Sequence, residues 1–409
     1  MLLKMERPAW ILISNRTRKK ERKYMINIPT EVFANILCRL PVKSLKRFQC
    51  VCKSWYELIK NPNFIIQHLH QYSNNKNVSE NCLLFTYTTP CRCHPTHLEP
   101  ADHVNSLYAY NIEEDVSLHL LDLPYRDEKL YLDIFGPCNG IYCLHHLRSI
   151  MLVNVALREF QVLPELSIQP HPCSMKTVGF GFDPKTNDYK VVLIVNCTCN
   201  EAQTLCFPRQ VLVYSSSCNS WRKADDTVPS SVDVSIIKSS INTYVKGNFH
   251  WLAANFVPGD VTAYYRVLCF SMFDEVLHEM RLPSCLTVVQ DSDSTFYELA
   301  SYNGSLSLIV SPCKPQEQWF DVWVKQDYDD DAWTKLLSIR LVAGIFKPMG
   351  FWRDDQFLLD DCSGQLVFYN SSTHNIKKNL CFYSETGVDK YFSQTIFYSE
   401  SLVSVIDRG

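Results

Sequence analysis

Cysteine and histidine residues gather between positions 91 and 103, and soft ligands this close together could bind zinc. The run reads Cys91-Arg-Cys93-His94-Pro-Thr-His97, with His103 following. A Cys-x-Cys pair, however, differs from the Cys-x-x-Cys spacing of common zinc sites. A polar surface loop explains these residues equally well, so we predict no metal site and no cofactor.

Carboxylates form a second group, in the run Asp327-Tyr-Asp-Asp-Asp331. Four carboxylates could bind calcium, but the run lacks the ligand spacing and the glycine of an EF-hand loop. We predict instead a charged hairpin tip between two strands. Because such a tip could attract a basic partner, its members are candidate substrate-binding residues: Asp327, Asp329, Asp330 and Asp331.

A histidine pair is the remaining candidate for catalysis. His145-His146 lies in an apolar, strand-like run without an obvious acidic partner. The sequence contains no phosphate-binding glycine loop, nucleophile elbow or His-Glu-x-x-His motif. We therefore expect a non-catalytic protein whose function depends on binding surfaces.

The first such surface is predicted in a helical stretch between residues 28 and 69. Thr30 can accept a hydrogen bond from the free N–H groups of a first helix. Apolar residues at helical spacing form one face of that helix: Val32, Phe33, Ile36, Leu37 and Leu40. Pro41 disfavours helical geometry at the residue before it and ends the helix.

Two more short helices fit the following residues, one over 43–49 and one over 51–59, the latter stopped by Asn61-Pro62. A domain of about forty residues is marginally stable alone. An apolar helix face that this small core cannot bury therefore favours binding to a partner.

The order of residues in this stretch resembles the F-box. The matching motifs are Glu31, Ile36-Leu37, Arg39-Leu40-Pro41, Lys43-Ser-Leu45, Arg47-Phe48, Val51-Cys-Lys53, Trp55, Leu58-Ile59 and Phe64. In Ile28-Pro29, Ile stands where the family usually has Leu. The resemblance implies docking on a Skp-type adaptor, which links the protein to a cullin scaffold and to ubiquitin transfer.

The same resemblance implies which residues form or support the adaptor-facing surface. They are Ile28, Pro29, Ile36, Leu40, Pro41, Val42, Leu45, Val51 and Trp55. The alternative is that they form only a private three-helix core.

Charge is unevenly distributed along the 409 residues, although the net charge is only −3. Residues 1–72 hold 14 of the 40 basic and 4 of the 43 acidic residues, a charge of +10, which leaves −13 for the remainder. An acidic C-terminal part favours basic partners and opposes nucleic acid.

Eighteen cysteines would suggest disulfides in a secreted protein, but the apolar run at residues 9–13 is too short for a secretory signal. No stretch is apolar enough to span a membrane. We expect reduced thiols, mostly buried, in the cytoplasm or the nucleus. The basic segment 1–24 is interpreted as a disordered tail, with a nuclear-import patch as the alternative.

From residue 82 onward short strands and tight turns such as Asn139-Gly140 and Asn303-Gly304 dominate. A repeated unit consists of a strand, a polar turn and a second strand opened by a bulky residue. Its equivalent marks are Asn154, Tyr214, Phe270, Val324 and Tyr369, at intervals of 60, 56, 54 and 45 residues. Kelch repeats run to about 50 residues. We predict a ring of β-blades, with a pair of β-sandwiches as the alternative.

This half resembles the plant F-box-associated domain, through motifs such as Gly179-Phe-Gly-Phe-Asp183, Asp188-Tyr-Lys-Val-Val192 and Asn219-Ser-Trp221. Within that family, Ile134-Phe-Gly136 and Trp333-Thr-Lys-Leu-Leu337 are most similar to S-locus F-box proteins of plant self-incompatibility. The predicted fold is therefore α+β and multidomain: a tail (1–24), a three-helix F-box (25–70), a linker (71–81) and an all-β, propeller-like domain (82–409).

The resemblance implies a substrate-recognition subunit of a Skp–cullin–F-box ubiquitin ligase, with a basic S-RNase as substrate. Segments 196–210, 258–265 and 311–319 lack strand periodicity and are candidate contact loops, which adds Arg209, Asp260 and Lys314 to the candidate substrate-binding residues. Two alternatives remain open. One is a general plant F-box receptor for a developmental or stress-related substrate, and the other is a ligand-binding propeller with an unused F-box.

Overall fold

The computed structural model describes most of the chain from Pro29 onward. The described residues are 29–74, 82–90, 103–112, 114, 116–124, 132–146, 149–166, 175–198, 205–224, 235–236, 243–256, 262–289, 295–312, 319–326, 332–340, 347–353, 356–360, 366–380 and 396–406. All structural statements below concern these residues.

Four helices open the described chain: α1 (Thr30–Leu37), α2 (Val42–Phe48), α3 (Lys53–Lys60) and α4 (Pro62–Asn74). The three predicted helices are confirmed to within three residues at each end. The predicted cap on the first helix is wrong, because Thr30 is already helical and no side chain caps α1. Instead, the carbonyl of Pro29 accepts hydrogen bonds from the N–H groups of Val32 and Phe33, at 3.0 and 3.2 Å.

Helix α4 was not predicted, because Asn61-Pro62 was interpreted only as a stop signal. Proline also suits the first position of a helix, where its missing N–H is not needed. The side chain of Asn61 accepts a hydrogen bond from the N–H of Asn63 at 2.8 Å, as expected at a helix start. Because α4 continues to Asn74, the predicted linker begins with helical residues.

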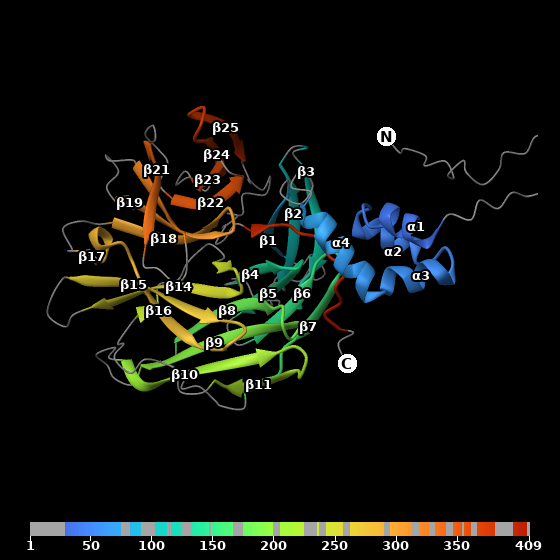
Figure 1. The fold of residues 1–409 in the computed structure, drawn as a ribbon, viewed down its shortest axis with the longest axis horizontal. Helices are drawn as coiled ribbons and strands as arrows, with labels where there is room; N and C mark the ends of the chain where they lie inside the picture. Colours follow the sequence, from blue (N-terminus) through green and yellow to red (C-terminus); the bar gives the residue numbers. More distant parts are fainter. Residues whose placement is uncertain are drawn as a thin grey trace, which may run out of the picture.

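The rest of the described chain forms six antiparallel sheets, which confirms the predicted all-β ring and gives it six blades (Figure 1). Blade A contains β26 (Ile396–Phe397), β1 (Cys82–Pro90), β2 (His103–Asn111) and β3 (Val116–Asp122). Blade B contains β4 (Leu132–Cys138), β5 (Ile141–His146), β6 (Ser149–Asn154) and β7 (Glu159–Val162). Blade C contains β8 (Met175–Asp183), β9 (Asp188–Thr198), β10 (Leu205–Ser215) and β11 (Ser220–Lys223).

The remaining three blades follow in chain order. Blade D contains β12 (Ser235–Ile236), β13 (Tyr244–Val245), β14 (Asn248–Phe256), β15 (Ala263–Ser271), β16 (Leu277–Arg281) and β17 (Val288–Val289), with the 3-10 helix η2 (Ser284–Leu286) before β17. Blade E contains β18 (Thr295–Tyr302), β19 (Ser305–Pro312), β20 (Trp319–Lys325) and β21 (Trp333–Arg340). Blade F contains β22 (Lys347–Arg353), β23 (Gln356–Asp360), β24 (Leu366–Asn370) and β25 (Asn375–Leu380).

The sequence repeat corresponds to the third strand of each blade. Asn154 ends β6, and Tyr214, Phe270, Val324 and Tyr369 each precede the last residue of β10, β15, β20 and β24. The first blade was missed by this repeat, although its third strand ends in the same way, at Asn111. The ring closes where β26, from the C-terminal end, pairs with β1.

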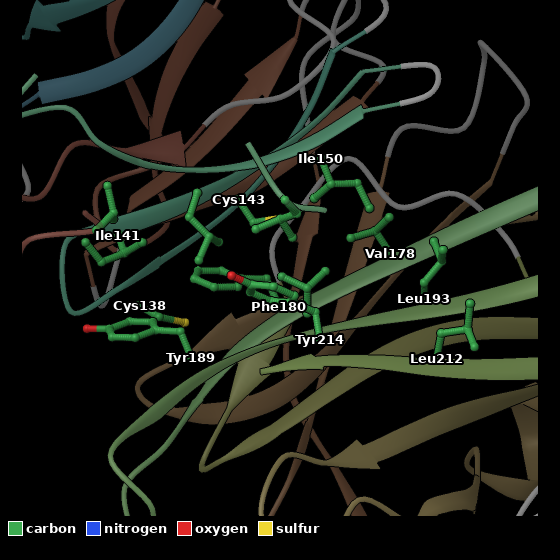
Figure 2. Close-up of a cluster of buried hydrophobic side chains, with 14 of the residues drawn as sticks. Cys138, Ile141, Cys143, Ile150, Val178, Phe180, Tyr189, Leu193, Leu212 and Tyr214 are labelled. Atoms are coloured by element: carbon green, nitrogen blue, oxygen red, sulfur yellow. The ribbon is translucent and has the colours of Figure 1, made fainter. Parts of the chain in front are cut away.

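Buried apolar side chains fill the spaces between neighbouring blades. The cluster between blades B and C includes Ile141 and Cys143 on one side and Phe180 and Leu193 on the other (Figure 2). Comparable clusters lie between every other pair of neighbours, including blades F and A. This continuous chain of interfaces explains why the sheets form a ring rather than two sandwiches, because each blade buries both of its faces.

The cysteines whose side chains the structure describes are free thiols. Cys38, Cys138, Cys143 and Cys269 are buried, whereas Cys50, Cys52, Cys218 and Cys285 are exposed. Burial raises the pKa of the Cys269 thiol to about 12. The expected burial therefore applies to only part of the described set.

Candidate functional site

The F-box helices carry apolar side chains that the chain itself leaves exposed. Val32 and Ile36 lie one turn apart on α1, so they share a face, and Ile36 is 53% exposed. Val51, just before α3, is 57% exposed. We call Val32, Ile36 and Val51 the F-box patch. A large aliphatic side chain left in water forgoes about 1.5–3 kcal/mol of burial free energy, so the patch favours an apolar partner.

The residues predicted for the adaptor surface divide by burial into three groups. Pro29, Ile36, Pro41 and Val51 are exposed, Leu40 and Trp55 are half-buried, and Val42 and Leu45 are fully buried. Ile28 lies outside the described residues. Val42 and Leu45 therefore support the surface from inside, whereas Val32 belongs to the exposed patch and was not among the predicted site residues.

Trp55 packs against the F-box core and against aromatic side chains of the two preceding helices. Its ring centroid lies 5.9 Å from that of Phe33 on α1 and 5.3 Å from that of Phe48 on α2. Edge-to-face and tilted aromatic contacts of this kind fix the relative position of the elements that carry them. The aromatic contacts thus hold three short helices in register behind the exposed side chains.

The core beneath the F-box helices also includes residues from the propeller. Leu37, Val42, Leu45, Ile59 and Phe64 pack with Leu402, which lies after the last strand. Ala156 and Leu157, in the turn between β6 and β7, pack against the same cluster. The private three-helix core considered above is therefore not what the described residues form, because the F-box shares its core with blade B and the C-terminal segment.

The two faces of the propeller differ in their connections. We call one the turn face, which carries the described turns 139–140, 155–158, 184–187, 216–219, 246–247, 272–276, 303–304 and 371–374. The opposite side, where the second strand of each blade is connected to the third, is the loop face. The F-box lies at the turn face, since it contacts the turn at 155–158 (Figure 1).

All but one of the candidate substrate-binding residues lie outside the described part of the chain. Asp260, Lys314 and the acidic run Asp327 to Asp331 lie outside the described residues, and Arg209 lies in β10 with only its backbone described. The strand ends that flank residue 260, Phe256 and Ala263, lie at the loop face, as do Pro312 and Trp319 around residue 314.

The strand ends around the acidic run are different. Lys325 and Trp333 pair with each other at the turn face. The described strand ends that flank residues 260 and 314 thus lie at the loop face, and those that flank the acidic run lie at the turn face.

The histidine pair has an acidic neighbour, contrary to the sequence-based expectation. Nδ1 of His145 lies 3.7 Å from Oδ2 of Asp133, on the paired strands β5 and β4. Both side chains are largely buried. The separation exceeds that of a hydrogen bond, so the two side chains are neighbours without a hydrogen bond between them.

Buried charges join blades C and D at the turn face. Nζ of Lys190 lies 2.9 Å from Oδ2 of Asp183 and 2.9 Å from Oε1 of Glu275, and donates to the carbonyl of Met272 at 2.7 Å. Arg222 pairs with the other oxygen of Glu275. Burial alone would raise the pKa of Asp183, but hydrogen bonds from Thr186 and Lys190 hold it below its ordinary value. The network fixes two blades to each other.

The described residues contain neither a metal-binding cluster nor a helix suited to span a membrane. No group of three or more His, Cys, Asp or Glu side chains is placed to hold a metal ion in the described part of the chain. The Cys91 to His97 run lies outside it, and only the backbone of His103 is described. None of the described helices combines the length and the apolar character that a membrane span needs.

Comparison with known proteins gives matches over nearly the whole chain. Residues 25–67 match the F-box domain model, and residues 101–405 match the model of the F-box associated beta propeller domain. The chain is 30% identical over 353 residues to the F-box/kelch-repeat protein At3g23880 of Arabidopsis thaliana, covering 85% of this chain and 88% of that protein. It is 24% identical over 373 residues to the F-box protein CPR1 of the same plant, covering 85% and 82%.

Proposed function

The chain belongs to the plant F-box proteins that carry an F-box-associated β-propeller, and we propose on this premise that it is the substrate-recognition subunit of a Skp–cullin–F-box ubiquitin ligase. The F-box binds the Skp-type adaptor, which connects the protein to the cullin scaffold. The propeller binds the protein that is to be ubiquitinated. Both partners meet this chain in the cytoplasm.

The F-box patch is the observation that carries the proposal. Ile36 and Val51 are more than half exposed, although the helices around them pack tightly on Val42 and Leu45. An apolar surface on a well-packed domain indicates an interaction site. Its place on the F-box supports the adaptor as the partner.

The mechanism needs no catalytic side chain from this chain. Holding a substrate next to the ubiquitin-charged enzyme raises the effective concentration of its lysine residues, and that is sufficient for rate enhancement. The propeller then contributes binding and orientation.

For the substrate, we propose the loop face of the propeller, with Arg209, Asp260 and Lys314 as contact residues. Two observations support this choice. The F-box occupies part of the turn face, and the strand ends flanking these residues lie at the opposite face. A substrate bound there would remain accessible while the adaptor is bound. The acidic run Asp327 to Asp331 is a separate candidate surface for a basic substrate.

The narrower proposal is that the substrate is a basic S-RNase of plant self-incompatibility. It is supported by the resemblance of the Ile134-Phe-Gly136 and Trp333 to Leu337 motifs and by the charge of −13 after residue 72. Its test is the abundance of the protein in mature pollen, leaf, root and pistil. Confinement to pollen is expected, and expression mainly in leaf would leave the ligase role with a different, developmental or stress-related substrate.

The adaptor is tested with Ile36→Asp, which places a charge in the F-box patch without disturbing the core. We expect purified adaptor to bind this variant at least tenfold more weakly than the parent chain, a loss of about 1.4 kcal/mol or more. The matched control is Ile376→Asp on β25, because Ile376 is 50% exposed and lies on the propeller. Equal binding by Ile36→Asp and the parent chain would contradict the proposal and favour a propeller with an unused F-box.

A further inference from the structure

The segment from Tyr398 to Ile406, which we call the strap, follows directly from the strand that closes the ring. Strand β26 pairs with β1, and the N–H of Tyr398 continues this pairing by donating to the carbonyl of Cys82 at 2.8 Å. The chain then leaves the sheet and runs between blade B and the F-box helices (Figure 1). Its position therefore depends on ring closure.

Blade B holds the strap through the side chains of Asn154 and Glu159. The side-chain amide of Asn154 donates to the carbonyls of Ser401 and Val403, at 3.0 and 2.7 Å, and Asn154 is fully buried. The carboxylate of Glu159 accepts a hydrogen bond from the hydroxyl of Ser404 at 2.7 Å. These bonds fix the strap's backbone on the turn face.

Apolar side chains of the strap enter two different cores. Leu402 is 6% exposed and belongs to the F-box core. Val403 and Val405 pack into the core between blades B and C. Adjacent residues of one short segment thus join the F-box to the propeller interior.

The strap also supplies a helix cap to the F-box. The N–H of Val42, the first residue of α2, donates to Oε2 of Glu400 at 2.9 Å. Pro41 precedes α2 and provides no side-chain cap. The first N–H groups of a helix lack partners within it, and a carboxylate at that end is favoured by both hydrogen bonding and the helix dipole. Glu400 performs this role across 358 residues of sequence.

We propose that the strap makes adaptor binding conditional on a closed propeller. Glu400 and Leu402 are positioning residues, which complete the F-box and hold it in one orientation on the turn face. This inference rests on the proposed adaptor-binding function. It adds that the strap controls adaptor binding.

The physical basis is the small size of the F-box. Its helices have 7 to 13 residues each and a core of seven buried side chains, one of which is Leu402. Helices this short depend on tertiary packing for stability. Without the strap the competent form becomes a fraction of the population, and the apparent dissociation constant for the adaptor rises in inverse proportion to that fraction.

During synthesis, the F-box emerges before the strap that completes it. The F-box is made before the propeller, whereas the strap follows the propeller strands and reaches its place only when β26 has paired with β1. A chain whose ring is incomplete then presents an incomplete F-box. Ligase assembly thereby selects chains with a finished substrate-binding domain.

The experiment measures binding of purified adaptor to the full-length chain by calorimetry. The variants are Leu402→Ala, which empties the strap's place in the F-box core, and Glu400→Ala, which removes the cap. We expect at least a tenfold loss of affinity for each. Leu402→Met restores most of the volume and should bind within threefold of the parent chain. Ile406→Ala is the matched control, because Ile406 lies in the strap but is 62% exposed.

Hydrogen exchange on the same proteins separates a local effect from general unfolding. Exchange should rise in α2 and α4 of the Leu402→Ala and Glu400→Ala variants, while β9 of blade C keeps its protection. If Leu402→Ala also loses protection in β9, its loss of affinity reflects general unfolding of the propeller. The Glu400→Ala variant then tests the inference, since that change removes a side chain without opening the propeller core.

The outcomes distinguish this inference from the proposed function. If the parent chain itself does not bind adaptor, the proposed function fails. If the parent binds and both variants bind within twofold of it, the strap does not control the F-box and the inference is overturned while the ligase role stands.

Discussion

Among neighbouring F-box residues, burial separates those that can contact a partner from those that support the contact. Ile36 and Leu45 are both apolar motif positions, yet Ile36 is more than half exposed and Leu45 is fully buried. Substitutions at the two positions should therefore affect different measurements.

Leu45→Ala should lower the free energy of F-box unfolding by about 2–5 kcal/mol, because it opens a cavity in the core. Ile36→Ala should change stability by no more than about 0.5 kcal/mol, since its side chain has few contacts to lose. Hydrogen exchange in α2 and α3 measures the first effect, and adaptor affinity measured on folded protein detects the second. Equal destabilisation by both changes would contradict the division by burial.

Glu400 predicts a pH dependence at the residue scale. Burial raises the pKa of its carboxyl, although the Val42 N–H and the charge of Lys43 oppose the rise. Between the ordinary glutamate pKa of about 4.3 and the raised value, the folded state holds more protons than the unfolded state. The contribution of this group therefore falls as pH increases through that window.

Hydrogen exchange of α2 should consequently be slower at the lower end of this pH window than at pH 7, after correction for intrinsic rates. Glu400→Gln keeps an oxygen that accepts from Val42 but does not titrate. In this variant the local stability of α2 should be independent of pH over the same range. A slope that persists in Glu400→Gln would assign the effect to another group.

Among the elements, blade-to-blade contacts recur in a form that explains part of the sequence repeat. Nε1 of Trp221, in β11, donates to the carbonyl of Pro164 in the preceding blade at 2.8 Å. Nε1 of Trp333, in β21, likewise donates to the carbonyl of Arg281 at 2.9 Å. The tryptophan at the start of the fourth strand thus forms a hydrogen bond that joins its blade to the preceding blade.

The charged network between blades C and D predicts a large effect of one substitution. Lys190→Met removes the cation that pairs with both Asp183 and Glu275. Among the ion pairs of the described residues, Lys190 is the partner of Asp183. The substitution should destabilise the propeller by about 3–5 kcal/mol, because a buried carboxylate is left unpaired. The double variant Lys190→Met with Asp183→Asn should regain part of this loss. Chemical denaturation of the parent chain, the two single variants and the double variant measures the coupling energy between Lys190 and Asp183.

For the whole molecule, the tight turn at Asn139-Gly140 in blade B lies against the strap. Gly140 has φ +74°, and a Cβ there would lie 2.3 Å from the Cβ of Ser401 in the strap. Gly304 belongs to an identical Asn-Gly turn with φ +71°, and a Cβ there would meet nothing within 4 Å. A residue with a Cβ would therefore be strained at either position, but only at Gly140 would it also collide with the strap.

Gly304→Ala should cost about 1–2 kcal/mol of stability through its left-handed backbone and leave adaptor affinity unchanged. Gly140→Ala has the same strain and also displaces the strap. It should therefore weaken adaptor binding as well, although it lies in the propeller. Thermal melting and calorimetry with the adaptor measure the two effects, and equal adaptor binding by both variants would argue against communication through the strap.

Features that depend on near neighbours in the chain could be predicted from the sequence. Apolar residues at helical spacing located three F-box helices, and the Asn-Gly turns and strand repeats located the blades. The sequence missed α4, because Asn61-Pro62 carries both a stop and a start signal, and it placed buried Val42 and Leu45 with exposed Ile36. Local patterns identify an apolar face but not what covers it.

Contacts between distant segments set the number of blades, the face on which each candidate loop begins and the completion of the F-box. Leu402 and Glu400 have no local signal that relates them to α2, which lies more than 350 residues earlier. Their role arises because β26 returns the C-terminal end to β1, next to the F-box. Such contacts depend on how the ring closes, and ring closure is a property of the packed blades rather than of any one segment.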